Sequence, residues 1–379
     1  MSTKRSSCIS AATCAALVMI LGVPCATPVE APVDSPRFEV DPFWPKPLPD
    51  RWVTGDVAFV CVGPRDHVFI LNRRNLSDHE LDAGQQAPAV IEFDPEGYVV
   101  NAWGDPNVLP AGALHGFFVD HEGNVWIAGE EGTILQKWSH DGSKLLLQIG
   151  SRGVADWSQG AAKGKSWDSS QTLIFAVQDV FVDPKNDDIY VANSGNRGVV
   201  VFDRNGQFLR QWALENTKPA KAEGEPPDET RRFSPHCIML SNDDLVYVCD
   251  RLGDQAQVFD KMGKFQKSIN IDFEQRSKSP KRPGHHAAGW STVMHLAFSP
   301  DPAQKFLYVA NSADQQVDIL DRASGRILST FGRAGHQLGE FADTHTLAAD
   351  SKGNIYVAEG WHNVGAGRRI QKFRVVSGQ

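Results

Sequence analysis

Hydrophobic and polar positions along this chain form a block that recurs. Each block is a short apolar run, a polar turn rich in Asp, Asn or Gly, and a second apolar run of the type "YVAN". Alternating apolar positions bounded by such turns are typical of paired β-strands. Six blocks of this kind occur, at 55–74, 115–130, 178–194, 236–251, 295–312 and 345–360.

A third and a fourth strand follow each block, as in "GVVVFDRNG" and then "FLRQWA". The intervening turns have the Asp, Asn and Gly residues that hairpins require. Four strands per unit, repeated six times, predict an all-β fold, a six-bladed β-propeller. The last unit is one strand short, and the segment "RFEVD" near the N-terminus can supply it. We expect this pairing to close the ring and protect its edges.

The first 31 residues differ in composition from the repeats. A positively charged start, a short apolar run and a stretch of small residues give the layout of a secretory signal peptide. The run is too short for a comfortable membrane span, so we expect no integral span after cleavage. The mature protein, residues 32–379, is then one propeller domain, periplasmic or secreted. A lipid anchor on Cys25 is the disfavoured alternative, because proline precedes it.

The chain carries a formal net charge of −8. A nucleic-acid-binding protein normally presents a basic face, so this balance argues against nucleic acid as the partner. We expect a monomer that acts on a small-molecule or peptide substrate.

The candidate functional residues are the first residues of the six inner strands. We expect these six residues to lie near the propeller axis, all at the same height along it. Four of these six positions are histidines, although the chain has only 12. Imidazole is a usual neutral ligand for zinc and related metals. The ring predicts a metal site, with a water-filled polar funnel as the alternative. The six positions are Gly55, His115, Gln178, His236, His295 and His345.

Two arginines end the second strands of opposite blades. Arg73 and Arg251 suggest planar donors for an anionic substrate above the metal ring. The alternative is that each forms an ion pair with a neighbouring carboxylate.

Two cysteines flank the turn of the fourth block. Cys237 and Cys249 face each other if that hairpin folds about Asp243, and a cross-strand disulfide is then possible. Two buried free thiols are an equally good interpretation. Long insertions at 151–174, 213–233 and 271–292 lead into inner strands, and they either carry binding residues on the same face or are solvated loops.

The repeats resemble NHL-type six-bladed propellers over residues 55–375, with "DxxGNIYVA" as the recurring core. A closer resemblance is to the peptidyl-α-hydroxyglycine α-amidating lyases, which hold zinc with three histidines on alternate blades. The segments "ALHGFFVD", "SPHCIMLS" and "DTHTLAAD" place His115, His236 and His345 at those positions. The two active-site arginines of that family match Arg73 in "LNRRN" and Arg251 in "CDRLG".

The resemblance implies that zinc, or another transition metal such as copper or iron, promotes cleavage of a C–N bond in a hemiaminal. Arg73 and Arg251 would hold the carboxylate of the substrate. The sequence departs from the family in having no tyrosine near Ser194, the place of the catalytic tyrosine. The candidates to replace this base are His295, Asp343 or a residue from a covering loop. Thr346 stands where the family has an acidic calcium ligand, which argues against a calcium site.

Two classes of function therefore remain. The first is a metal-dependent lyase on a propeller. The second is a non-catalytic NHL module that binds a peptide, a cell-envelope fragment or a partner protein. A lactonase-type hydrolase ranks third, because the axial ring lacks the carboxylate and Asn ligands that hold calcium in such enzymes.

Overall fold

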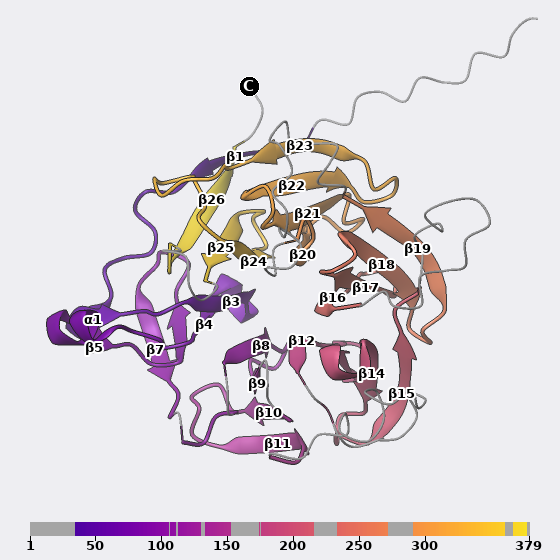
Figure 1. Ribbon diagram of the computed structural model, residues 1–379, viewed down its shortest axis with the longest axis horizontal. Coiled ribbons are helices and arrows are strands. Elements are labelled where there is room, and N and C mark those ends of the chain that lie inside the picture. Colours follow the sequence, from indigo (N-terminus) through magenta and orange to yellow (C-terminus); the bar gives the residue numbers. More distant parts are fainter. Residues whose placement is uncertain are drawn as a thin grey trace, which may run out of the picture. The chain divides into compact units, whose positions relative to one another are not determined.

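Six four-stranded antiparallel sheets lie around a central axis, each contributing one blade (Figure 1). The all-β, six-bladed propeller predicted from the repeats is thereby confirmed. The computed structural model describes residues 35–105, 107–110, 113–129, 133–152, 174, 176–215, 233–271, 291–360 and 367–376.

Within each blade the chain runs from an inner strand near the axis to an outer strand at the rim. Blade 1 contains β3 (Val57–Val62), β4 (Val68–Asn72), β6 (Val90–Phe93) and β7 (Val99–Trp103). Blade 2 contains β8 (Leu114–Val119), β9 (Val125–Gly129), β10 (Ile134–Trp138) and β11 (Leu145–Gly150). Blade 3 contains β12 (Val177–Val182), β13 (Ile189–Asn193), β14 (Gly198–Phe202) and β15 (Phe208–Ala213).

The other three blades follow the same plan. Blade 4 contains β16 (Pro235–Leu240), β17 (Leu245–Asp250), β18 (Gln255–Asp260) and β19 (Phe265–Asn270). Blade 5 contains β20 (His295–Phe298), β21 (Phe306–Asn311), β22 (Gln316–Asp321) and β23 (Ile327–Phe331). Blade 6 contains β24 (Thr344–Ala349), β25 (Ile355–Glu359) and β26 (Ile370–Val376), and its outer strand is β1 (Arg37–Val40).

The N-terminal strand closes the ring as predicted. Strand β1 pairs antiparallel with β26, from Arg37 opposite Val376 to Val40 opposite Phe373. The ring of Phe38 packs against Tyr308 and Phe331 of blade 5. Blade 6 is therefore built from both ends of the propeller, and its open edge is covered.

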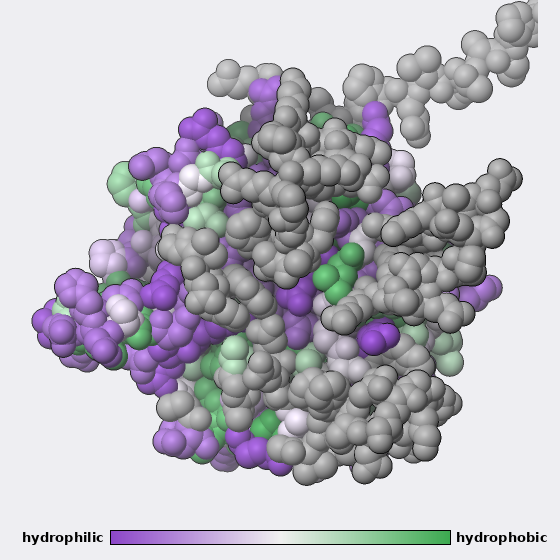
Figure 2. Space-filling view, viewed as in Figure 1, coloured by the Kyte–Doolittle hydropathy of each residue, from purple (hydrophilic) through white to green (hydrophobic). Residues whose placement is uncertain are grey.

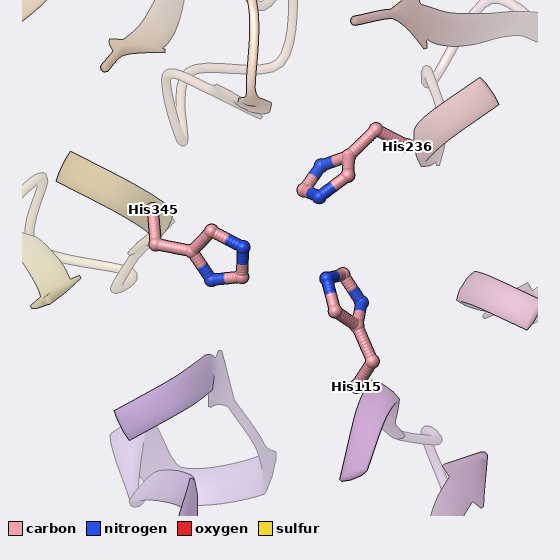
Figure 3. A group of neighbouring side chains, drawn as sticks. All are labelled: His115, His236 and His345. Atoms are coloured by element: carbon pink, nitrogen blue, oxygen red, sulfur yellow. The ribbon is translucent and has the colours of Figure 1, made fainter. Parts of the chain in front are cut away.

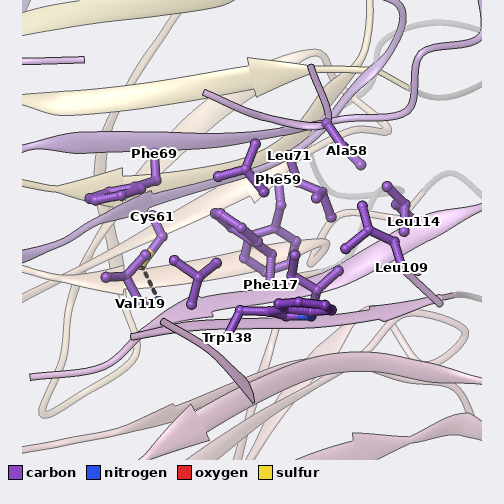
Figure 4. Packing of buried hydrophobic residues seen from close by; sticks show 14 residues of the cluster. Ala58, Phe59, Cys61, Phe69, Leu71, Leu109, Leu114, Phe117, Val119 and Trp138 are labelled. Carbon is purple, nitrogen blue, oxygen red and sulfur yellow. Dashed lines mark hydrogen bonds between the residues drawn. The ribbon is translucent and has the colours of Figure 1, made fainter. Parts of the chain in front are cut away.

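The apolar core is divided among the junctions between neighbouring blades. Each of six buried clusters draws its residues from two adjacent blades. Figure 4 shows the junction of blades 1 and 2, where Phe59 and Leu71 meet Phe117 and Trp138. Because every junction buries apolar surface, each blade is held by both of its neighbours.

Five inner strands contain a bulge, at which the register shifts by one residue. The shifts fall between Val57 and Phe59 in β3, and at the matching places in β8, β12, β16 and β24. In blade 5, Met294 donates a backbone hydrogen bond to Ala310, the residue that also pairs with His295. A bulge aims an extra side chain away from the regular alternation of the strand.

A short excursion leaves blade 1 between β4 and β6. It contains the helix α1 (Asp78–Ala83), and its strand β5 (Gln85–Gln86) pairs in parallel with β2 (Trp52–Val53). Ser77 caps α1, and the Glu80 side chain bonds back to the Ser77 backbone. Hydrophilic residues dominate its surface in Figure 2. Three single-turn 3-10 helices, at Pro49–Arg51, Pro64–Asp66 and Ser194–Asn196, complete the elements described.

The proposed leader, residues 1–31 with Cys25, lies outside the described residues, as do most of the three long insertions. In the part of the chain that is described, no helix has the length and apolar character needed to cross a membrane.

We predict that ring closure depends on Phe38. Replacing Phe38 with Ala removes the contacts to blade 5 and should lower the free energy of unfolding by about 1–3 kcal/mol, because this ring is partly rather than fully buried. Chemical denaturation monitored by tryptophan fluorescence would measure this change in the free energy of unfolding. Glu39, exposed on the same strand, is the matched control, and Glu39→Ala should change stability by less than about 0.5 kcal/mol. Equal effects of the two substitutions would contradict the closing role of Phe38.

Candidate metal centre

Three histidines from alternate blades converge on the axis (Figure 3). His115 lies on β8, His236 on β16 and His345 on β24, in blades 2, 4 and 6. Their ring centroids are 4.8, 5.1 and 5.2 Å apart, and one ring nitrogen from each lies within 4.8 Å of the others. All three side chains are fully buried.

Each histidine occupies the bulge of its inner strand and bonds to the next blade. The Nδ1–H of His115 donates to the carbonyl oxygen of Gln178 at 2.8 Å. His236 bonds in the same way to Met294 at 2.8 Å, and His345 to Ala58 at 2.7 Å. A carbonyl oxygen only accepts, so Nδ1 carries the proton in all three rings. Nε2 is therefore the nitrogen of each ring that can act as a metal ligand.

The surroundings keep these rings neutral. Burial, followed by the charges of the other histidines and of Arg73 or Arg251, holds the pKa of His115 and His236 well below the ordinary value. Burial and then Arg73 do the same for the pKa of His345. Neutral imidazole is the form that binds a metal ion.

The donor set suits zinc. Three imidazole nitrogens plus one open position is a known arrangement for catalytic zinc, with Zn–N bonds of about 2.0–2.1 Å. Because the three ring nitrogens lie within 4.8 Å of one another, an ion at their centre would lie at most about 2.8 Å from each. Inward shifts of less than about 1 Å, within reach of small ring rotations, close that difference. The three buried histidines can therefore hold a transition metal.

The two predicted arginines follow second strands on opposite blades. Arg73 comes directly after β4, and Arg251 directly after β17. The Nε–H of Arg73 donates to the carbonyl oxygen of Leu114, next to His115, at 3.0 Å. Both positive charges act on His115 and His345. The structure therefore brings both guanidinium groups to the end of the channel that holds the histidines.

Asp343 lies two residues before His345 and is 4% exposed. Its Oδ1 accepts from the Ser312 hydroxyl at 3.4 Å, and its Oδ2 has no hydrogen-bond partner among the described residues. Burial, with the nearby charge of Glu359, raises the pKa of the Asp343 carboxyl to about 7. A carboxyl group of this kind exchanges protons near neutral pH.

The predicted ring of six positions at one height, four of them histidines, is wrong at two positions. The bulge site of blade 1 is Ala58 rather than Gly55, and that of blade 5 is Met294 rather than His295. His295 lies one residue further along, where its ring packs edge-on against Phe59 and its Nε2 is 3.6 Å from the Asp179 carboxylate. The side chain belongs to a different level of the channel.

A signal in the sequence could have placed this ring correctly. Each inner strand ends at a turn residue that bonds across the first hairpin, such as Asp120, Ser241 or Ser299. Counting back five residues from each of the six turn residues gives one consistent set. That set is Ala58, His115, Gln178, His236, Met294 and His345. Sequence reasoning also missed Asp179, which the same count places one residue after the bulge of blade 3.

Other departures from the amidating lyases have structural counterparts. The chain has five tyrosines, and no described contact brings any of them to the three histidines. Tyr190 and Tyr247 bond to arginines at the other end of their blades, and Tyr356 to Asp350. Thr346 Oγ1 accepts from the backbone N–H of Val60 at 3.1 Å. The position of the family's calcium ligand is thus occupied by a hydrogen bond between blades.

The cysteines that flank the fourth block are joined. Cys237 and Cys249 form a disulfide across β16 and β17, while Cys61 is a buried free thiol. Because Cys237 directly follows His236, the bond anchors the strand beside one of the metal-site histidines.

Comparison with known proteins finds two groups of relatives. Mouse (Mus musculus) NHL repeat-containing protein 3 is 27% identical over 354 residues, covering 90% of this chain and 85% of the relative. Peptidyl-glycine alpha-amidating monooxygenase B of Xenopus laevis is 23% identical over 347 residues, covering 86% of this chain. The chain spans only 35% of the length of the Xenopus protein. No protein-family model matches the sequence.

Solved structures share the fold. A catalytically inactive variant of virginiamycin B lyase from Staphylococcus aureus, bound to quinupristin, superposes with a TM-score of 0.50 and 12% identity, covering 90% of this chain and 88% of the lyase. A streptogramin B lyase structure gives a TM-score of 0.50 at 11% identity, covering 89% of this chain and 98% of that one. These identities support likeness of fold alone. The protein is a six-bladed β-propeller whose homologues include NHL repeat-containing protein 3 and the peptidylglycine amidating monooxygenases.

Proposed function

We propose that this protein is an exported, metal-dependent lyase that cleaves a C–N bond in a small anionic substrate, in the manner of the amidating lyases. The observation that carries the proposal is the set of three buried histidines whose Nδ1 atoms are all bonded to the next blade. That arrangement presents three neutral Nε2 donors to one point, which suits a metal ion better than a structural packing role.

Zinc is the metal that we assign to His115, His236 and His345. When bound, it would supply Lewis acidity that polarises an oxygen of the substrate. The buried histidines contribute a fixed, neutral donor set. The bonds to the carbonyl oxygens of Ala58, Gln178 and Met294 prevent each ring from turning away.

Arg73 and Arg251 would bind the carboxylate of the substrate. They approach the three histidines from blades 1 and 4, on opposite sides of the ring. A guanidinium group offers a planar pair of donors that matches a carboxylate. Two such groups on opposite sides fix the orientation of a small substrate as well as its charge.

The substrate class that fits is an N-acylated α-hydroxyglycine. Cleavage of this hemiaminal breaks the bond between the α-carbon and the amide nitrogen, and the electron pair of the bond stays on nitrogen. The hydroxyl group loses its proton and becomes the carbonyl of glyoxylate, while the nitrogen gains a proton and leaves as a primary amide. The reaction therefore needs a residue that can take up a proton near the hydroxyl group.

Asp343 is our candidate for this proton transfer. It is buried beside the site, its Oδ2 has no hydrogen-bond partner among the described residues, and the charge of Arg73 reaches it. His295, the other candidate from the sequence, faces Asp179 at a different level of the channel. We therefore assign no role in the reaction to His295.

A second candidate function is a non-catalytic NHL module in which any metal is structural. The match to NHL repeat-containing protein 3 favours it, since that relative is covered over 85% of its length. The absence of a tyrosine at the family's catalytic position points the same way. Turnover of a defined substrate separates the two functions.

We predict that the purified protein binds about one equivalent of zinc after incubation with the metal and exhaustive dialysis. His236→Ala should lose most of this metal, because the substitution removes one of three protein ligands. Elemental analysis by mass spectrometry measures the content. His79→Ala, which changes an exposed histidine on α1, is the control and should retain the metal. Equal metal content in His236→Ala and the wild type would contradict the site.

We predict that Arg73 is needed for turnover. With N-benzoyl-α-hydroxyglycine as substrate, Arg73→Ala should reduce kcat/KM for glyoxylate release by about 10²–10³-fold. The matched control is Arg204→Ala, since that side chain is 66% exposed, and it should leave the rate unchanged. Zinc-loaded wild-type protein that gives no glyoxylate above the uncatalysed rate would overturn the lyase and favour the NHL binding module.

A further inference from the structure

A cavity of about 450 Å³ lies on the axis below the histidine ring. Its lining follows the later residues of the inner strands, including Val119, Leu240 and Leu347, and ends at turn residues such as Asn242 and Ser351. The last two are exposed. The three metal-site histidines, near the starts of the same strands, do not contribute to the lining. The cavity therefore reaches the surface at the opposite end of the channel.

Two polar side chains meet at the inner end of this cavity. Asp179 is 2% exposed and His295 is 3% exposed. The Asp179 carboxylate accepts backbone N–H groups of Val180 and Ile238, at 2.8 and 2.9 Å. The His295 Nε2 faces Asp179 Oδ2 at 3.6 Å, longer than an ordinary hydrogen bond, and the His295 Nδ1 has no hydrogen-bond partner among the described residues. Most buried polar atoms in folded proteins have a hydrogen-bond partner, so a buried nitrogen without one in the described structure indicates a place for a ligand or an ordered water.

The rest of the lining is largely apolar. Phe59, Phe117 and Met239 contribute to the walls, and the Phe59 ring packs edge-on against His295 with centroids 4.9 Å apart. Apolar walls with a few convergent polar groups at the closed end are the usual form of a small-molecule site. The volume also falls in the range of such sites, about 300–1,000 Å³.

The charge of the lining selects among ligands. Its carboxylates are Asp179 and Asp350, and among the lining residues that the structure describes there is no lysine or arginine. Burial raises the pKa of the Asp179 carboxyl. A positive charge placed beside this group would offset the cost of burying its ionised form. An anionic ligand would meet the carboxylates of Asp179 and Asp350, and His295 is the one described lining residue whose side chain can carry a positive charge.

We infer that this cavity binds a small organic ammonium ion with an aliphatic or aromatic body. The ammonium group donates to Asp179 Oδ2 and to a ring nitrogen of His295, and the body lies against Phe59, Phe117 and Met239. The aromatic ring faces add a favourable environment for the cation.

The site is separate from the metal centre, although Phe59 connects them. The Phe59 ring lies 4.9 Å from the His295 ring and 6.4 Å from the His115 ring, centroid to centroid. None of the residues assigned to ammonium binding is one of the three histidines of the metal centre, so the proposal does not rest on the lyase function.

Isothermal titration calorimetry of the purified protein with phenethylamine tests the inference. Phenethylamine should bind, and 3-phenylpropanoate, which has a similar body and the opposite charge, should bind at least about tenfold more weakly. Asp179→Asn should weaken amine binding by about tenfold or more, the value of one charge-assisted hydrogen bond. Glu92→Gln, which alters a buried carboxylate outside the cavity, is the control and should leave the amine affinity within about twofold of wild type.

A second variant covers the case in which Asp179→Asn does not fold, since Asp179 holds two backbone N–H groups. Ala297 lies two residues after His295 and lines the cavity, so Ala297→Leu fills space beside the polar pair and should also abolish amine binding. No amine binding to the wild type, equal affinity for amine and carboxylate, or full affinity in the folded Asp179→Asn or Ala297→Leu variant would overturn the inference.

Discussion

The hydrogen bond from each ring histidine to a backbone carbonyl of the following blade is the contact on which the candidate site depends. It joins blade 2 to blade 3, blade 4 to blade 5 and blade 6 to blade 1. One bond does two things, since it fixes the position of the ring and also its tautomer. Because the acceptors are backbone atoms, the identity of the side chain at the acceptor position is free to vary. Ala58, Gln178 and Met294 share nothing except their place in the bulge.

A sixfold scaffold thus carries a threefold site. The even blades contribute imidazoles and the odd blades contribute carbonyl oxygens, and both come from the same bulge of the inner strand. The arrangement requires every blade to hold its angle to the next, which is what the six apolar clusters between blades provide. The pairing of β1 with β26 completes blade 6, so the N-terminal strand contributes to the placement of His345.

Much of this could be predicted from the sequence because the signals are local. Strand alternation and turn residues predicted the six blades and the closing strand. The recurring place of His115, His236 and His345 within their blocks predicted that these three histidines meet at the axis. The height of His295 could not be found by aligning the first residue of each block. A bulge inserts a residue without a side-chain signature, and a slip of one position turns a side chain to another side of the strand.

The other features of the site depend on contacts between residues that are far apart in the sequence. The pairing of His295 with Asp179 joins residues from blades 5 and 3, and the burial of Asp343 beside Glu359 depends on how β24 and β25 pack. The spacing of these residues along the sequence does not indicate either contact. The sequence likewise left open whether Cys237 and Cys249 are bonded, because either state is compatible with a hairpin.

X-ray absorption spectroscopy of the zinc-loaded protein tests the central claim most directly. Three imidazole nitrogens at about 2.0 Å, with one further light atom, are the expected first coordination shell. A shell of oxygen atoms alone, without the scattering pattern of imidazole rings, would contradict a metal centre built on His115, His236 and His345.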